Sequence, residues 1–116
     1  MKIKKLTRFL KFFLGSDVIG ITIAPFGIYL NEDYLTDPIT INHEKIHWKQ
    51  QVEMLIIPFY IWYIVELLWK KILHGKMAYY AISFERESYY NDTNLQYLDI
   101  RKPYNWINYL TFPFSI

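Results

Sequence analysis

The chain has 116 residues, of which 53% are hydrophobic, 20% aromatic and 21% charged. This composition excludes intrinsic disorder, because so much apolar surface is stable only when it is buried or in lipid. The absence of Cys excludes disulfides and thiolate metal sites, and a net charge of +2 is too small to suggest a nucleic-acid partner. We therefore predict one domain over residues 1–116, in which any metal is held by His and carboxylate side chains.

The first element is a basic amphipathic segment, because residues 1–14 carry five basic side chains and no acid. Apolar residues recur there at helical spacing, namely Ile3, Leu6, Leu10, Phe13 and Leu14. Lys11 interrupts the apolar run of a signal peptide and no small-residue cleavage site follows, so we expect an uncleaved helix over residues 1–15. Two interpretations stay open: the helix docks on the core, or it lies on an anionic membrane surface with its Phe side chains inserted.

The next segment, residues 18–30, carries no charge and is rich in β-branched and aromatic residues. We predict a strand over residues 18–24, a turn over 25–27, and a short second strand or a continuation over 28–30. A polar loop and then a helix follow, with Thr40 as the predicted N-cap. Because the rest of the chain reads as helical, the predicted fold class is α+β, mainly helical.

The predicted helix contains an HExxH sequence at residues 43–47. His43 and His47 lie one turn apart on the same face, so both imidazoles can point a nitrogen at one ion. Glu44 flanks that position and need not be a ligand, which leaves its carboxylate free to accept a proton from a water molecule. The alternative is a pair of histidines without an ion. A di-iron site is excluded, because the sequence has no second ExxH pair.

Two histidines do not hold zinc firmly, so a third ligand is expected further along the chain. The candidate side chains are Glu66, His74, Glu85, Glu87, Asn91 and Asp92. We expect Glu66 to lie on the same bent helix as the motif and therefore too far from the two histidines to share an ion with them. We expect His74 to lie in an exposed turn. Glu85 and Glu87 are about 200° apart on a later helix that can return antiparallel, so only one of them can face the ion. We favour Glu85 over Glu87.

The HExxH sequence with Gln50-Gln51, followed by Glu85-x-x-Ser88-Tyr89, resembles the gluzincin class of zinc metallopeptidases, and most of all the small HExxH proteins of bacteria and phages. Gluzincins take their third ligand from a Glu on a downstream helix, often within an E-x-x-A-D pattern. The resemblance implies that Glu85 is this ligand, that Ser88 is the small residue and that Tyr89 stands where Asp is usual. It also implies a minimal zincin-like domain, whose short β element lines the substrate cleft beside the HExxH helix.

The expected function is that of a zinc-dependent hydrolase, a peptidase acting on a peptide or protein substrate. Zn²⁺ held by His43, His47 and Glu85 would activate a water molecule, and Glu44 would be the general base. The sequence does not choose an oxyanion partner among Tyr79, Tyr80, Tyr89, Tyr90 and His74. The alternative is a non-catalytic membrane-associated or assembly protein with a structural metal site.

An uncharged stretch of 12 residues, 54–65, follows the motif. It is short for a transmembrane helix, which needs about 20 apolar residues, and Pro58 would kink a continuous helix. Its two interpretations are a buried core helix, or an interfacial or membrane-embedded helix with Lys70, Lys71 and Lys76 on the cytoplasmic side. A membrane surface and a second copy of the chain are therefore candidate partners. We expect the protein in the cytoplasm or at the inner face of the membrane.

Overall fold

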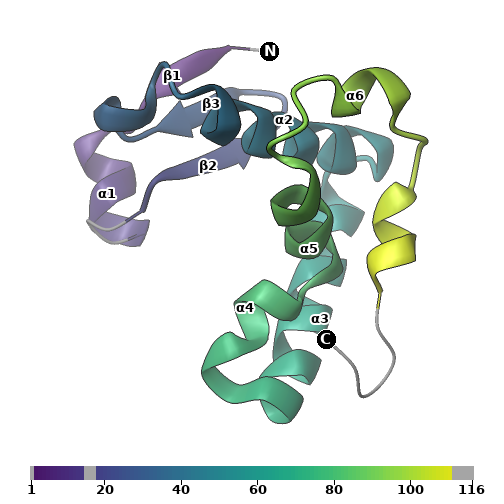
Figure 1. Ribbon diagram of the computed structural model, residues 1–116. Coiled ribbons are helices and arrows are strands. Elements are labelled where there is room, and N and C mark those ends of the chain that lie inside the picture. The colour runs from purple at the N-terminus through teal and green to yellow at the C-terminus, as the bar shows by residue number, and fades with distance from the viewer. Residues whose placement is uncertain (1, 15–17, 111–116) are drawn as a thin grey trace.

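The computed structural model describes residues 2–14 and 18–110, apart from the side chains of Phe13 and Leu14. The fold is α+β and mainly helical, which confirms the predicted fold class. A small sheet lies at one end of the molecule beside helix α2, and helices α3, α4 and α5 extend away from it (Figure 1). This arrangement leaves α2 between the sheet on one side and α5 on the other.

The sheet contains three strands in the order β1-β3-β2. Strand β3 (Gly27–Leu30) is central, and β1 (Ile3–Lys5) pairs with it in parallel while β2 (Gly20–Ile23) pairs with it antiparallel. Two side chains of the central strand, Ile28 and Leu30, are fully buried. Two strands joined by a turn are confirmed between residues 18 and 30, although β2 spans only Gly20–Ile23 and Gly27 belongs to β3 instead of the turn. Strand β2 lies at the edge of the sheet that faces α2.

The N-terminal segment differs from the predicted helix over residues 1–15. Residues Ile3–Lys5 form β1, and helix α1 spans only Arg8–Leu14. The strand forms because its backbone groups find partners on β3, as when the Leu6 N–H donates to the Leu30 carbonyl at 2.8 Å. Such pairing outweighs the weak helical preference of a short isolated segment. The Thr7 hydroxyl then accepts a hydrogen bond from the first turn of α1. Residues 1 and 15 of the predicted helix lie outside the described residues.

Helix α2 (Pro38–Glu53) carries the HExxH sequence and begins two residues before the predicted start. Its N-cap is Asp37 instead of Thr40, and the Asp37 carboxylate accepts a hydrogen bond from the Thr40 N–H at 3.2 Å. Pro38 opens the helix, where its missing N–H leaves no hydrogen bond unmade. The preceding loop contains a short 3₁₀ helix, η1 (Glu32–Tyr34).

The apolar stretch after the motif was predicted to continue the motif helix as one bent helix, but it forms a separate helix. Helix α3 spans Ile57–His74, and the chain turns before it because Leu55 and Ile56 adopt positive φ angles of 58° and 70°. Pro58 then lies in the first turn of α3, where it is tolerated. Among the described residues, no single helix is long and apolar enough to cross a membrane. The segments Pro38–Glu53 and Ile57–Asn91 meet that criterion only as a pair bent by 113°.

Only one side of α3 is buried, so the interpretation as a core helix holds for that side alone. The buried side chains are Phe59, Glu66 and Lys70. Phe59 packs in the hydrophobic core with Ile82, Phe84 and Trp106. The opposite side exposes six aliphatic side chains, Ile57, Ile61, Ile64, Val65, Leu68 and Ile72.

After α3 the chain returns through the 3₁₀ helix η2 (Gly75–Met77) and the short helix α4 (Ala78–Ala81) into α5 (Ser83–Asn91). The carboxylate of Glu66 accepts hydrogen bonds from the backbone N–H and the hydroxyl of Ser83, at 2.7 and 3.0 Å. Glu66 therefore anchors the start of α5 and, as predicted, does not reach the motif. Helix α6 (Tyr97–Ile100) and the 3₁₀ helix η3 (Asn105–Tyr109) follow.

Candidate metal centre

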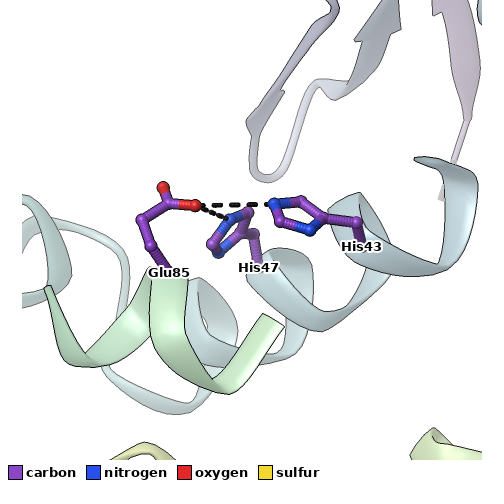
Figure 2. Close-up of side chains that lie close together, drawn as sticks. All are labelled: His43, His47 and Glu85. Atoms are coloured by element: carbon purple, nitrogen blue, oxygen red, sulfur yellow. Dashed lines mark hydrogen bonds and ion pairs between the residues drawn. The ribbon is translucent and has the colours of Figure 1, made fainter. Parts of the chain in front are cut away.

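Helices α2 and α5 bring two histidines and one carboxylate together (Figure 2). His43, His47 and Glu85 are all buried, and the ligand atoms that they offer lie within 4.8 Å of one another. Glu85 Oε1 is 3.0 Å from His47 Nε2 and 3.4 Å from His43 Nε2. Two ligands on a tetrahedral zinc ion are about 3.3 Å apart, so these separations suit a shared ion.

The other ring nitrogen of each histidine has an acceptor as its partner. His43 Nδ1 lies 3.1 Å from Asp92 Oδ2, and His47 Nδ1 lies 2.7 Å from Gln50 Oε1. Because these oxygens only accept, each Nδ1 carries the proton and each Nε2 turns toward Glu85. This arrangement is the one in which imidazoles bind a metal through Nε2.

The side chain of Gln50 is itself held in one orientation. Its Nε2 donates hydrogen bonds to the Phe84 carbonyl at 3.0 Å and to Glu87 Oε1 at 2.9 Å. The amide oxygen therefore has to face His47. A chain of hydrogen bonds thus runs from α5 through Gln50 to the ring of His47, and this chain sets the direction of Nε2.

The electrostatics of the cluster favour one positive charge at its centre. Burial alone would lower the pKa of His47, but the neighbouring Glu85 carboxylate, with help from Glu44 and Gln50, raises it to about 9. Burial would raise the pKa of Glu85, yet the two imidazoles hold it well below its usual range. A proton or a metal cation can supply this charge, and metal binding would displace the proton.

Glu85 is oriented by a tyrosine of α3. The Tyr63 hydroxyl donates a hydrogen bond to Glu85 Oε2 at 3.0 Å, which leaves Oε1 for the two histidines. Burial, followed by the charge of Glu85, raises the pKa of Tyr63, so this hydroxyl stays a donor. Helix α3 therefore holds one oxygen of the Glu85 carboxylate, while the histidines of α2 meet the other.

Glu44 lies beside the cluster and is buried, with 8% of its surface exposed. The Thr22 hydroxyl of β2 lies 2.8 Å from Glu44 Oε1 and 2.9 Å from the Glu44 carbonyl oxygen. The strand runs close to this carboxylate, since a Cβ added at Gly20 would lie 3.7 Å from Glu44 Cδ. The position of the Glu44 carboxylate therefore depends on how β2 packs against α2.

The contact between β2 and α2 is fixed by Gln51, which is fully paired with the free edge of the strand. Its Nε2 donates to the Thr22 carbonyl at 2.8 Å, and its Oε1 accepts from the Ala24 N–H at 2.8 Å. The side-chain amide thus replaces a neighbouring strand along this part of the edge. Gln51 thereby places Thr22 against Glu44.

A cleft of about 540 Å³ opens onto these groups. His43, Glu44, His47 and Glu85 form its polar part, together with Asp92 and Thr22. Its walls are largely apolar and aromatic, being lined by Val18, Ile19, Ile21, Ile39, Phe59, Tyr60, Tyr63, Tyr79 and Tyr89. A molecule that reaches the cluster therefore has to pass between β2 and the aromatic residues of α3, α4 and α5.

Glu87, the alternative third ligand, faces away from the histidines. Its carboxylate accepts hydrogen bonds from Gln50, from the Tyr97 hydroxyl and from Arg101 Nε, the last two at 2.6 Å. Burial would raise the pKa of Glu87, but these hydrogen bonds, that of Arg101 first, lower it. The structure therefore brings Glu85, and not Glu87, to the cluster.

We expect Arg101→Met to lower the free energy of unfolding by about 3–5 kcal/mol at neutral pH, because it leaves the buried Glu87 charge unpaired. The contribution of Glu87 is present above the usual carboxyl pKa and is lost as the pH falls through the lowered pKa, so the defect should shrink in acid. Urea unfolding at several pH values measures this. Lys102→Met, at the exposed neighbouring position, is the control. Equal effects of the two substitutions would contradict the assignment.

The other sequence-predicted residues are placed as follows. Ser88 is fully buried and its hydroxyl donates to the His43 carbonyl at 2.7 Å, which confirms the predicted close packing of the two helices. The ring of Tyr89 packs edge-on against that of His43, with centroids 4.5 Å apart. Of the oxyanion candidates, Tyr79 and Tyr89 line the cleft, whereas His74 lies at the far end of α3.

Five residues at the site were not assigned their roles by sequence analysis, namely Thr22, Gln50, Gln51, Tyr63 and Asp92. Asp92 was considered as a ligand, and it instead accepts the Nδ1–H of His43. Its spacing of seven residues from Glu85 places both on one face of a helix, which is a signal that the sequence contains. No comparable signal points to Thr22 or Tyr63, because their roles depend on tertiary packing.

Comparison of the chain with models of known protein families, with curated proteins and with solved structures finds no match. A fold alone does not determine a function in any case, because one fold can carry many activities. Function must therefore be inferred from the chemistry of the site.

Proposed function

We propose that the protein is a metal-dependent hydrolase of the gluzincin type, a zinc peptidase in which Glu44 is the general base. The observation that carries the proposal is the convergence of His43 Nε2, His47 Nε2 and Glu85 Oε1, with the Glu44 carboxylate at the same cleft. A structural metal site needs only its ligands. Here a further buried carboxylate, held by Thr22, adjoins the cluster, as a catalytic site requires.

The residues fit a catalytic zinc ion. Two imidazoles and one carboxylate are the protein ligands of a well-known class of catalytic zinc sites, which keep the fourth position for water or substrate. The cluster is buried but borders the 540 Å³ cleft, so this position is accessible. When bound, such an ion would lower the pKa of a water molecule to about 7 and polarise a carbonyl group.

The side chains at the cleft would carry out the proton transfers and would hold the ligands and the substrate in place. Glu44 would accept the proton of the attacking water and later deliver it to the leaving amine. Thr22 would hold the Glu44 carboxylate, while Tyr63 would hold Glu85 as a ligand. The apolar walls of the cleft would bind apolar side chains of a peptide and exclude bulk water. Of the five candidate oxyanion partners, Tyr79 and Tyr89 line the cleft, and we propose that one of these two stabilises the oxyanion.

We place this hydrolase in the cytoplasm or at the inner face of the membrane. Five basic residues and no acid occur in residues 1–14, and such a segment is attracted to the anionic lipids of a cytoplasmic leaflet. The absence of Cys means that the chain needs no oxidising compartment to reach its fold.

Metal removal tests the proposed function. Zinc-loaded protein should cleave members of a peptide library, as read by mass spectrometry, and the cleavage should stop after chelation and return with added zinc. The reason is that no other described group at the cleft can replace the lost polarisation of the carbonyl. A zinc-loaded protein that cleaves no peptide would overturn the proposal, and cleavage that survives chelation would do the same.

A second prediction concerns the position of the base. We expect Thr22→Val to lower kcat about 10–100-fold, because it removes a hydrogen bond to a charged group, whereas Thr22→Ser should retain most of the activity. Measurement of kcat for the unchanged protein and for both variants checks this. Equal kcat values for the Val and Ser variants would show that the hydroxyl does not act on Glu44.

A further inference from the structure

Helix α3 carries an exposed aliphatic stripe along its whole length. The six residues of the stripe are Ile57, Ile61, Ile64, Val65, Leu68 and Ile72, which are 43–87% exposed. Their spacing places them on one face about 100° wide and about 22 Å long. A monomeric soluble protein rarely exposes a continuous apolar face of this kind, so we expect a binding partner to cover the stripe.

The burial pattern of α3 is the reverse of that of an ordinary surface helix, because charged side chains face the protein and aliphatic side chains face outward. Its two buried charged residues, Glu66 and Lys70, lie on the side opposite to the stripe, where Glu66 caps α5. That buried side also carries Phe59 and Tyr63, which line the cleft of the candidate metal centre. The side of α3 that holds the site together is thus already occupied, and the stripe is left for an external contact.

The exposed charges of α3 beside the stripe are positive. Glu66 is the only acid in α3, and it is fully buried. The exposed charge on the stripe's face is Lys71 at its C-terminal end, and Lys76 follows in the exposed turn after the helix. An aliphatic face that ends in lysines, without an exposed acid, matches the boundary between anionic headgroups and acyl chains.

We propose that α3 docks in the plane of an anionic lipid membrane through this stripe, with Lys71 and Lys76 at the headgroups. A second copy of the chain fits less well. Antiparallel pairing of two stripes would bring each Lys71 near the start of the other α3, where this helix offers no carboxylate. The cleft stays open in the docked protein, because Phe59 and Tyr63 lie on the opposite side of α3. The proposal does not depend on the proposed hydrolase activity.

Sedimentation of the full chain with vesicles tests the docking. We expect the protein to bind vesicles of phosphatidylcholine with about 30% phosphatidylglycerol, and to bind pure phosphatidylcholine at least about tenfold more weakly. Leu68→Gln with Ile72→Gln should lower binding to the anionic vesicles at least about tenfold. Lys71→Gln with Lys76→Gln should reduce the preference for anionic lipid, and the part that remains is that of the basic residues in positions 1–14.

The matched control is Ile100→Gln with Ile107→Gln, because these aliphatic residues are also 69% and 52% exposed but lie outside the stripe. It should bind within about twofold of the unchanged protein. Failure of the unchanged protein to bind anionic vesicles would overturn the proposal, as would equal loss in the control. A stripe variant that binds vesicles normally but turns a dimer into a monomer in light scattering would assign the stripe to a second copy instead.

Discussion

Replacing Glu44 with Gln should lower kcat/KM for peptide cleavage by about 10²–10⁴-fold while zinc binding is retained. Gln has nearly the same shape as Glu, and its amide oxygen can still accept the hydrogen bond from the Thr22 hydroxyl. It cannot take a proton from water, so only the general-base step is lost. The measurement is kcat/KM together with the zinc content of the same preparation.

Glu32→Gln is the control for this substitution, because Glu32 is exposed and its ion pair with Lys5 lies away from the cleft. It should change kcat/KM by no more than about twofold. A Glu44→Gln protein with full activity would contradict the assigned role. Loss of zinc in that variant would contradict it too, since it would make Glu44 a ligand instead of a base.

Replacing Glu85 with Ala should lower zinc affinity by more than about 100-fold, because the two histidines then lack the one carboxylate that the described residues bring to their Nε2 atoms. Asp92→Asn should have a smaller effect, about 10–100-fold, because it disturbs only the partner of His43 Nδ1. Competitive titration with a zinc-binding dye measures both affinities.

Glu87→Gln distinguishes Glu85 from the alternative ligand. Glu87 binds Arg101 and Tyr97 and touches the cluster only through Gln50, so this variant should lose stability but keep its zinc affinity within about tenfold. Zinc affinity that survives in Glu85→Ala and disappears in Glu87→Gln would reverse the ligand assignment.

The geometry of the motif could be predicted because it is local. The spacing of His43 and His47 places both on one helix face whatever the rest of the chain does. The same periodicity separates Glu85 from Glu87, so the sequence reduces the third ligand to a choice between two faces of α5. The choice of Glu85 agrees with the structure, in which Glu87 turns toward Arg101.

Features that depend on distant partners could not be predicted. Strand β1 exists because Ile3–Lys5 pairs with β3, more than 20 residues later, although its sequence continues the helical pattern. The break before α3 depends on positive φ angles at Leu55 and Ile56, which large aliphatic side chains rarely adopt. The hydrogen bond from Thr22 to Glu44 likewise joins β2 to α2, and the packing of these two elements could not be predicted from the sequence.

For the apolar stretch after the motif, the sequence predicted a helix but not which of its faces is buried. Its composition is compatible with a core helix and with a membrane helix, and hydropathy does not show which residues face inward. The structure buries Glu66 and Lys70 because the return of the chain at Ser83 and Ala81 supplies their hydrogen-bond partners. The aliphatic residues are consequently turned outward, and the face expected to build the core is the one that needs a partner.

X-ray absorption at the zinc edge, on protein loaded with one equivalent of zinc, tests the shared ion most directly. We predict nitrogen and oxygen neighbours at about 2.0–2.2 Å, with the outer-shell scattering of two imidazole rings. A spectrum with fewer than two imidazoles, or a protein that takes up no zinc, would contradict the joint coordination by His43, His47 and Glu85.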